Sequence, residues 1–170
     1  SLVNNNPFAL SLYVLAYDNN GKVTTATPNL KQNLKKYLSE YMLLTDSVNI
    51  KDAFIVNIGF NFEILALPNH TGREVLLNCT NVVKSYFAIS NRNINQPINI
   101  SKITTLLDKV KGVQTVQKIE IVNKVGATYS KFEYDVNAAK RNNVIYPSYD
   151  PCIFEIKYPN SDIKGRITTV

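Results

Sequence analysis

The side chains that most often carry enzymatic chemistry are few in this chain and far apart. The single histidine, His70, lies in the turn sequence "PNHTG", where a solvated turn residue is a simpler interpretation than a catalytic base. The cysteines, Cys79 and Cys152, occur in apolar patterns without a base that would activate a thiol. Two cysteines and one histidine are too few for a four-ligand zinc site. We therefore predict two buried thiols, no metal site and no catalytic residue.

The carboxylates and glycines also give no sign of a catalytic or nucleotide-binding site. Asp150 and Asp162 lie near prolines, where aspartate commonly forms turns. Glu63 and Asp52 could meet other acids only through the fold, which sequence spacing does not reveal. The six glycines are scattered and form neither G-x-G-x-x-G nor G-x-x-x-x-G-K-[ST], the loops that hold nucleotide phosphates. We expect a protein that is not an enzyme and that has no cofactor and no small-molecule substrate.

The charge of the chain allows one alternative, a basic nucleic-acid-binding domain with a ferredoxin-like fold. The net charge is +6 and the isoelectric point is about 9.2, values that favour contact with polyanions. The lysines are nevertheless spread along the chain, and the densest group, Lys31, Lys35 and Lys36, is typical of the solvent face of a helix. We do not expect nucleic-acid binding to be the main function.

The segment "IGFNFEI" (58–64) resembles the aromatic strand of RNA-recognition sheets, in which exposed aromatic rings stack on bases. Here Phe60 and Phe62 share the parity of Ile58 and Ile64, so they belong to a core face. The opposite face carries asparagine, glycine and glutamate, which do not stack on bases. The pattern thus favours a structural strand over an RNA-binding one.

Two elements are expected in the first third of the chain. The segment "FALSLYVLAYD" (8–18) is apolar and aromatic, which predicts a strand buried on both faces. Thr27 and Pro28 then begin a helix, because threonine caps a helix and proline suits its first turn. The predicted buried stripe of this helix contains Leu30, Leu34, Leu38 and Tyr41, with the lysines facing water.

The clearest element of the chain is a strand over residues 54–66. Its even positions from Phe54 to Ala66 are all apolar, while the odd positions in the middle carry Asn57, Gly59, Asn61 and Glu63. Strict alternation predicts one core face and one face open to solvent or to a partner. A bend or bulge at Gly59 is expected.

Two helices and two strands follow. Thr71 and Glu74 form a capping-box pattern before a helix with Val75, Cys79, Val82, Val83 and Tyr86 inward. A short strand, "PINI", precedes a helix that Ser101 can cap and that Gly112 ends, with Ile103, Leu106, Leu107 and Val110 inward. A strand is then predicted over about 115–123, with Ile119 and Ile121 on one side.

This order predicts an α+β fold: a two-layer α/β sandwich with a mixed sheet and helices on one face, and with a ferredoxin-like tendency. We place the sandwich at residues 1–124. Residues 125–170 carry alternating patches between prolines, so we predict a β-rich C-terminal extension that packs on this domain or on a partner.

The chain begins with Ser1 rather than Met, so we expect a fragment or a processed product. No apolar run reaches a membrane-spanning length, and we expect no membrane association.

Several segments together resemble the C-terminal region of a baseplate wedge protein of large contractile-tailed bacteriophages, akin to the baseplate J-like family. They are "ALSLYVLAYD", "LKKYLSEYMLLTDSVNIKDAFIVNIGFNFEI", "NQPINIS", "LLDKVKGVQTV" and "VIYPSYDPCIFEIKYPNSDIKGR". The resemblance covers about residues 8–166 in the same order, and no single segment is a catalytic signature. It implies a structural subunit of the ring-like baseplate framework, which rearranges when the tail contracts.

The resemblance also implies partners and a location. The partners would be further copies of the chain, in a homodimer or a ring, and other wedge proteins. The location would be the virion tail baseplate, after assembly in the host cytoplasm. From the residues themselves we take five candidates for an interface, since asparagines on an open strand face and tyrosines near the C-terminus suit protein contacts: Asn57, Asn61, Tyr146, Tyr149 and Tyr158.

Overall fold

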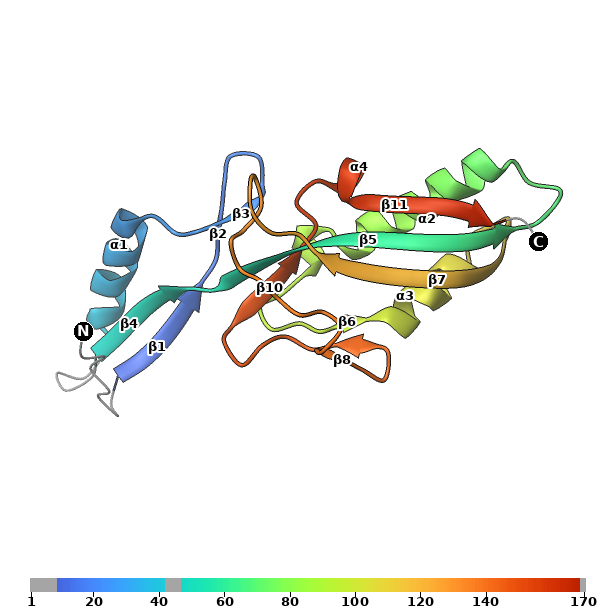
Figure 1. Cartoon of the computed structure of the whole chain (residues 1–170). Coiled ribbons are helices and arrows are strands. Elements are labelled where there is room, and N and C mark those ends of the chain that lie inside the picture. Colours follow the sequence, from blue (N-terminus) through green and yellow to red (C-terminus); the bar gives the residue numbers. More distant parts are fainter. Residues whose placement is uncertain (1–8, 42–46, 169–170) are drawn as a thin grey trace. The chain divides into compact units, whose positions relative to one another are not determined.

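The computed structural model describes residues 9–41 and 47–168, which fall into two compact units. Unit 1 is Ser1–Ala53 and unit 2 is Phe54–Val170. The division differs from the predicted one at 124/125, because the C-terminal segment pairs with the long strand that opens unit 2. The N-terminal strand and helix, which we had placed in the sandwich, form a unit of their own (Figure 1).

Unit 1 is built from a two-stranded parallel sheet, a short hairpin and one helix. In the sheet, β1 (Ala9–Val14) pairs with β4 (Ser47–Asp52). The hairpin pairs β2 (Ala16–Tyr17) with β3 (Val23–Thr24). Helix α1 (Pro28–Ser39) begins as predicted, since the Thr27 hydroxyl accepts a hydrogen bond from the Leu30 amide at 3.3 Å.

The predicted burial of unit 1 is wrong in two places. No described side chain of the 8–18 segment is buried, so this strand does not have two core faces. On α1, the side that packs toward β4 carries Leu34, Leu38 and Lys31, whose ammonium pairs with Asp52. The leucines at 34 and 38 are only half-buried. Lys31 therefore does not face water, whereas Leu30 does.

Unit 2 is organised around β5 (Phe54–Ala66), whose bounds are those predicted. Strand β7 (Val113–Asn123) runs antiparallel to β5, while β10 (Cys152–Glu155) and β11 (Ile163–Thr168) run parallel to its first and second halves. The register with β7 shifts after Glu63 and after Leu65, not at Gly59 where we expected a bulge. The even residues Val56 to Ile64 are buried, as the alternation predicted.

Two helices cover the core face of this sheet. Helix α2 (Gly72–Tyr86) contacts β11, α3 (Ile100–Asp108) contacts β7, and the helices contact each other (Figure 1). The cap of α3 is Asn99 rather than the predicted Ser101, because the Asn99 side-chain oxygen Oδ1 accepts the Lys102 amide at 2.9 Å. Thr71 precedes α2 but makes no side-chain cap hydrogen bond, so the predicted capping box is incomplete. Gly112 ends the α3 region with a φ of 93°.

The rest of unit 2 forms a small second sheet and short connectors. The second sheet has the order β6 (Ile98–Asn99), β9 (Val144–Ile145) and β8 (Lys140–Arg141). The connectors are η1 (Ile89–Asn91) and α4 (Pro159–Asp162). The molecule is thus an α+β protein with a mixed sheet and helices, as predicted. Its C-terminal segment is β-rich and packs on its own chain through β10 and β11.

Candidate functional site

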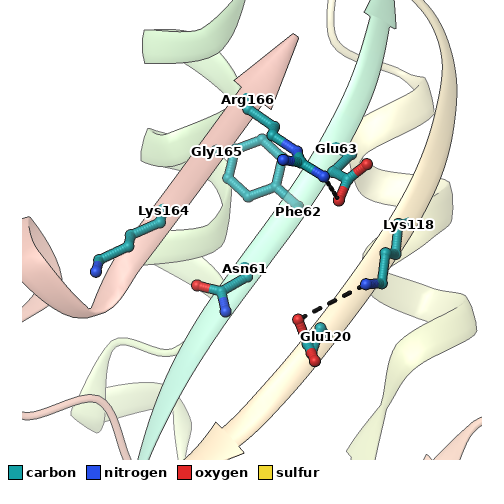
Figure 2. Close-up of a pocket in the computed structure, with 8 residues that line it drawn as sticks. All are labelled: Asn61, Phe62, Glu63, Lys118, Glu120, Lys164, Gly165 and Arg166. Atoms are coloured by element: carbon teal, nitrogen blue, oxygen red, sulfur yellow. Dashed lines mark hydrogen bonds and ion pairs between the residues drawn. The ribbon is translucent and has the colours of Figure 1, made fainter. Parts of the chain in front are cut away.

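The side of the β5, β7 and β11 sheet that points away from the helices carries a polar hollow (Figure 2). We call this surface the open sheet face. The hollow has a volume of about 310 Å³, and Phe62 and Gly165 close its floor. Six polar side chains from three strands line it: Asn61 and Glu63 from β5, Lys118 and Glu120 from β7, and Lys164 and Arg166 from β11.

The charges of this face are partly paired. Arg166 donates from Nη2 to Glu63 Oε1 at 2.6 Å, and Lys118 Nζ lies 3.9 Å from Glu120 Oε2 (Figure 2). Within the described residues Lys164 has no ion-pair partner, so β11 presents the free cation of the face. The described residues that line the hollow supply no exposed ring on which a base could stack. The face can offer hydrogen bonds and positive charge to another polar surface.

Asn57 is not part of the open sheet face, which contradicts our expectation for it. Its side chain is 1% exposed, and both ends of its amide are used within the chain. Nδ2 donates to Glu155 Oε2 at 2.8 Å, and Oδ1 accepts the Ser130 amide at 2.7 Å. The backbone carbonyl of Asn57 accepts from Lys124 N and from Asn123 Nδ2. The segment after β7 therefore covers the start of β5 and buries Asn57.

The other predicted interface residues have different surroundings. Asn61 is half-buried in the hollow. Tyr149 is fully exposed and Tyr146 is half exposed, with its carbonyl accepting the Tyr134 hydroxyl. Tyr158 is half-buried and stands edge-on to Tyr129, with ring centroids 5.6 Å apart. Of the five candidates only Asn57 is buried, so Asn61, Tyr146, Tyr149 and Tyr158 keep surface that a partner could reach.

A second exposed surface lies on unit 1. Leu30, Tyr37 and Tyr41 are 52%, 58% and 72% exposed, and their spacing of seven and four residues places them along one side of α1 and its end. The rings of Tyr37 and Tyr41 lie 5.2 Å apart. We call these three residues the α1 stripe. We had predicted Leu30 and Tyr41 to be buried, so their apolar surface remains uncovered by the described chain.

Three of the residues considered above as catalytic candidates, Cys79, Cys152 and Asp162, are buried in the fold. Both cysteines are buried, as predicted, and burial raises the pKa of the Cys79 thiol to about 11, so the thiol stays protonated at neutral pH. Burial is also the main cause that raises the pKa of Cys152. Asp162 accepts the Tyr129 hydroxyl at 2.6 Å and the Tyr158 amide at 3.0 Å. Among the described residues no group of histidine, cysteine and acidic side chains is placed to hold a metal ion.

Four residues of the open sheet face were not predicted from the sequence: Lys118, Glu120, Lys164 and Arg166. A signal was present. In "QKIEI" and "IKGRI", charged residues alternate with isoleucine or glycine, as they do on a strand with one polar face. The alternation predicts the face of each strand, but which strands share a sheet depends on the fold.

No protein-family model matches the chain, and no curated protein matches it either. None of the helices formed by the described residues is both long and apolar enough to cross a membrane.

Proposed function

We propose that the protein is a structural subunit of a bacteriophage tail baseplate wedge and that it associates with copies of itself. The order of the segments that resemble wedge proteins supports this assignment. The observation that carries the proposal is the α1 stripe, because three large apolar side chains lie exposed together on one side, and exposed apolar patches mark contact surfaces. The role is one of assembly within the virion, without catalysis or a cofactor.

The small core of unit 1 explains why a partner would stabilise it. Its described part buries only four apolar residues, Val23, Ala26, Val48 and Ala53. Its main sheet has two strands, and two strands with little covering are marginally stable alone. Covering Leu30, Tyr37 and Tyr41 with the same surface of a second copy would add buried apolar area to each copy.

The proposal is tested by sedimentation velocity of the whole chain over a range of protein concentrations. We expect a dimer or a larger closed assembly whose fraction increases with concentration. A chain that sediments only as a monomer at high micromolar concentration would contradict the proposal. Steeply salt-dependent binding to an oligonucleotide by a monomeric chain would favour the nucleic-acid-binding alternative instead.

A further inference from the structure

The outer edge of β11 has the features of a strand-docking site. Strand β11 pairs with β5 on one side, and within the residues that the structure describes no strand pairs with its other side (Figure 1). An unpaired edge presents a row of backbone N–H and C=O groups that can accept another extended chain.

The sheet face beside this edge is positively charged. Lys164 and Arg166 are two residues apart, so both side chains lie on the open sheet face of β11. Arg166 is bound to Glu63, while Lys164 has no ion-pair partner among the described residues. An added strand would place every second side chain next to these cations.

The opposite face beside the edge is apolar and is formed with α2. Gly165 and Ile167 of β11 lie against α2. A Cβ added at Gly165 would stand 2.7 Å from Leu76 Cδ1, and the Cδ1 atom of Ile167 lies against Gly72. Leu77 is 58% exposed and lies seven residues before Lys84, which reaches Asn160 just before β11. Leu77 and Lys84 therefore share one side of α2, next to the side on which Leu76 meets β11.

The charges also argue against a second copy as the occupant of this edge. An antiparallel pairing of two β11 strands centred on Gly165 would place Lys164 of one copy opposite Arg166 of the other. Like charges directly opposite each other destabilise a strand pair. The edge therefore disfavours self-pairing and favours a segment of opposite charge.

We propose that the outer edge of β11 binds an extended segment of another protein in which acidic and apolar side chains alternate. The acidic side chains would lie beside Lys164 and Arg166, and the apolar ones would lie against Leu77 and Ile167. The backbone of the segment would continue the sheet. This hetero-association goes beyond self-association through the α1 stripe and uses residues of unit 2 alone.

The test uses the whole chain and a fluorescent peptide with alternating glutamate and valine over six residues, flanked by glycine and serine. We expect saturable binding that weakens as salt is added. A peptide with lysine in place of glutamate should bind at least tenfold more weakly. Hydrogen exchange of the bound chain should show slower exchange in residues 163–168, because edge amides become hydrogen-bonded.

Two variants and a control locate the site. Lys164→Glu should weaken binding at least tenfold, and Leu77→Asp should weaken it by removing the apolar contact. Lys102→Glu, on the exposed side of α3, makes the same change in net charge and should bind as the parent does. Equal binding to all three variants, or protection outside β11 only, would overturn the proposal. So would an oligonucleotide that competes for the site while the peptide does not bind.

Discussion

The two units of the molecule bury their apolar residues to very different extents. Unit 2 has a continuous core that runs from Val56 to Ile163 and draws on both sheets and on α2 and α3. None of the residues of that core comes from unit 1, which exposes Leu10 and Tyr17 as well as the α1 stripe. Unit 2 thus has the means to fold as a domain, whereas unit 1 is better suited to contact than to independent stability.

The largest expected effect is tested by placing an aspartate at one apolar position in each unit. Phe60 is fully buried in β5, so Phe60→Asp removes a packed ring and places an unpaired charge in the core, at a cost of more than about 5 kcal/mol. Leu30→Asp acts on an exposed position and should leave the fold intact. Circular dichroism and thermal melting check both variants. A Phe60→Asp chain that melts cooperatively near the parent temperature would show that the core face of β5 is misassigned.

A second prediction compares the loss of stability when each of two asparagines of β5 is replaced by alanine. Asn57→Ala removes the hydrogen bond to the buried Glu155 carboxylate and the one from the Ser130 amide, which should cost about 3 kcal/mol of unfolding free energy. Asn61→Ala, at a half-exposed position, should change it by less than about 0.5 kcal/mol. Urea denaturation of both variants measures the difference. Equal losses would mean that the hydrogen bonds of Asn57 add nothing to stability.

A smaller change in folding stability is expected when the pH is raised, through the hydrogen bond between Tyr129 and Asp162. The hydrogen bond to Asp162 is the main cause that raises the pKa of Tyr129 to about 12, against about 10 in an unfolded chain. Because the folded pKa is the higher one, the stabilisation is complete below pH 10 and is lost as the pH rises from about 10 to 12. The stability difference between the parent and Tyr129→Phe should therefore shrink over that range. A difference that stays constant from pH 8 to 12 would contradict this.

Local patterns predicted most of unit 2. The alternation from Phe54 to Ala66 defined β5 and its core face, and the spacing of Val75, Cys79 and Val83 defined the buried side of α2. The helix cap at Ser101 was displaced to Asn99, because both residue types can cap and only the fold decides between them.

The errors arose where burial depends on distant parts of the chain. Asn57 has the pattern of an open-face residue, but Ser130 and Glu155 approach it from segments 73 and 98 residues away. Leu30 and Tyr41 fit a buried helical stripe, yet unit 1 has too few strands to cover them. Periodicity reports which side chains share a face, and it does not report what covers that face.

The central claim, that the exposed apolar side chains of unit 1 mediate self-association, is tested most directly by sedimentation of two matched variants. Leu30→Asp in α1 and Leu77→Asp in α2 make the same change at helix positions that are 52% and 58% exposed. We predict that the parent and Leu77→Asp associate equally, while Leu30→Asp remains folded and sediments as a monomer. A Leu30→Asp chain that associates as strongly as the parent would contradict the claim.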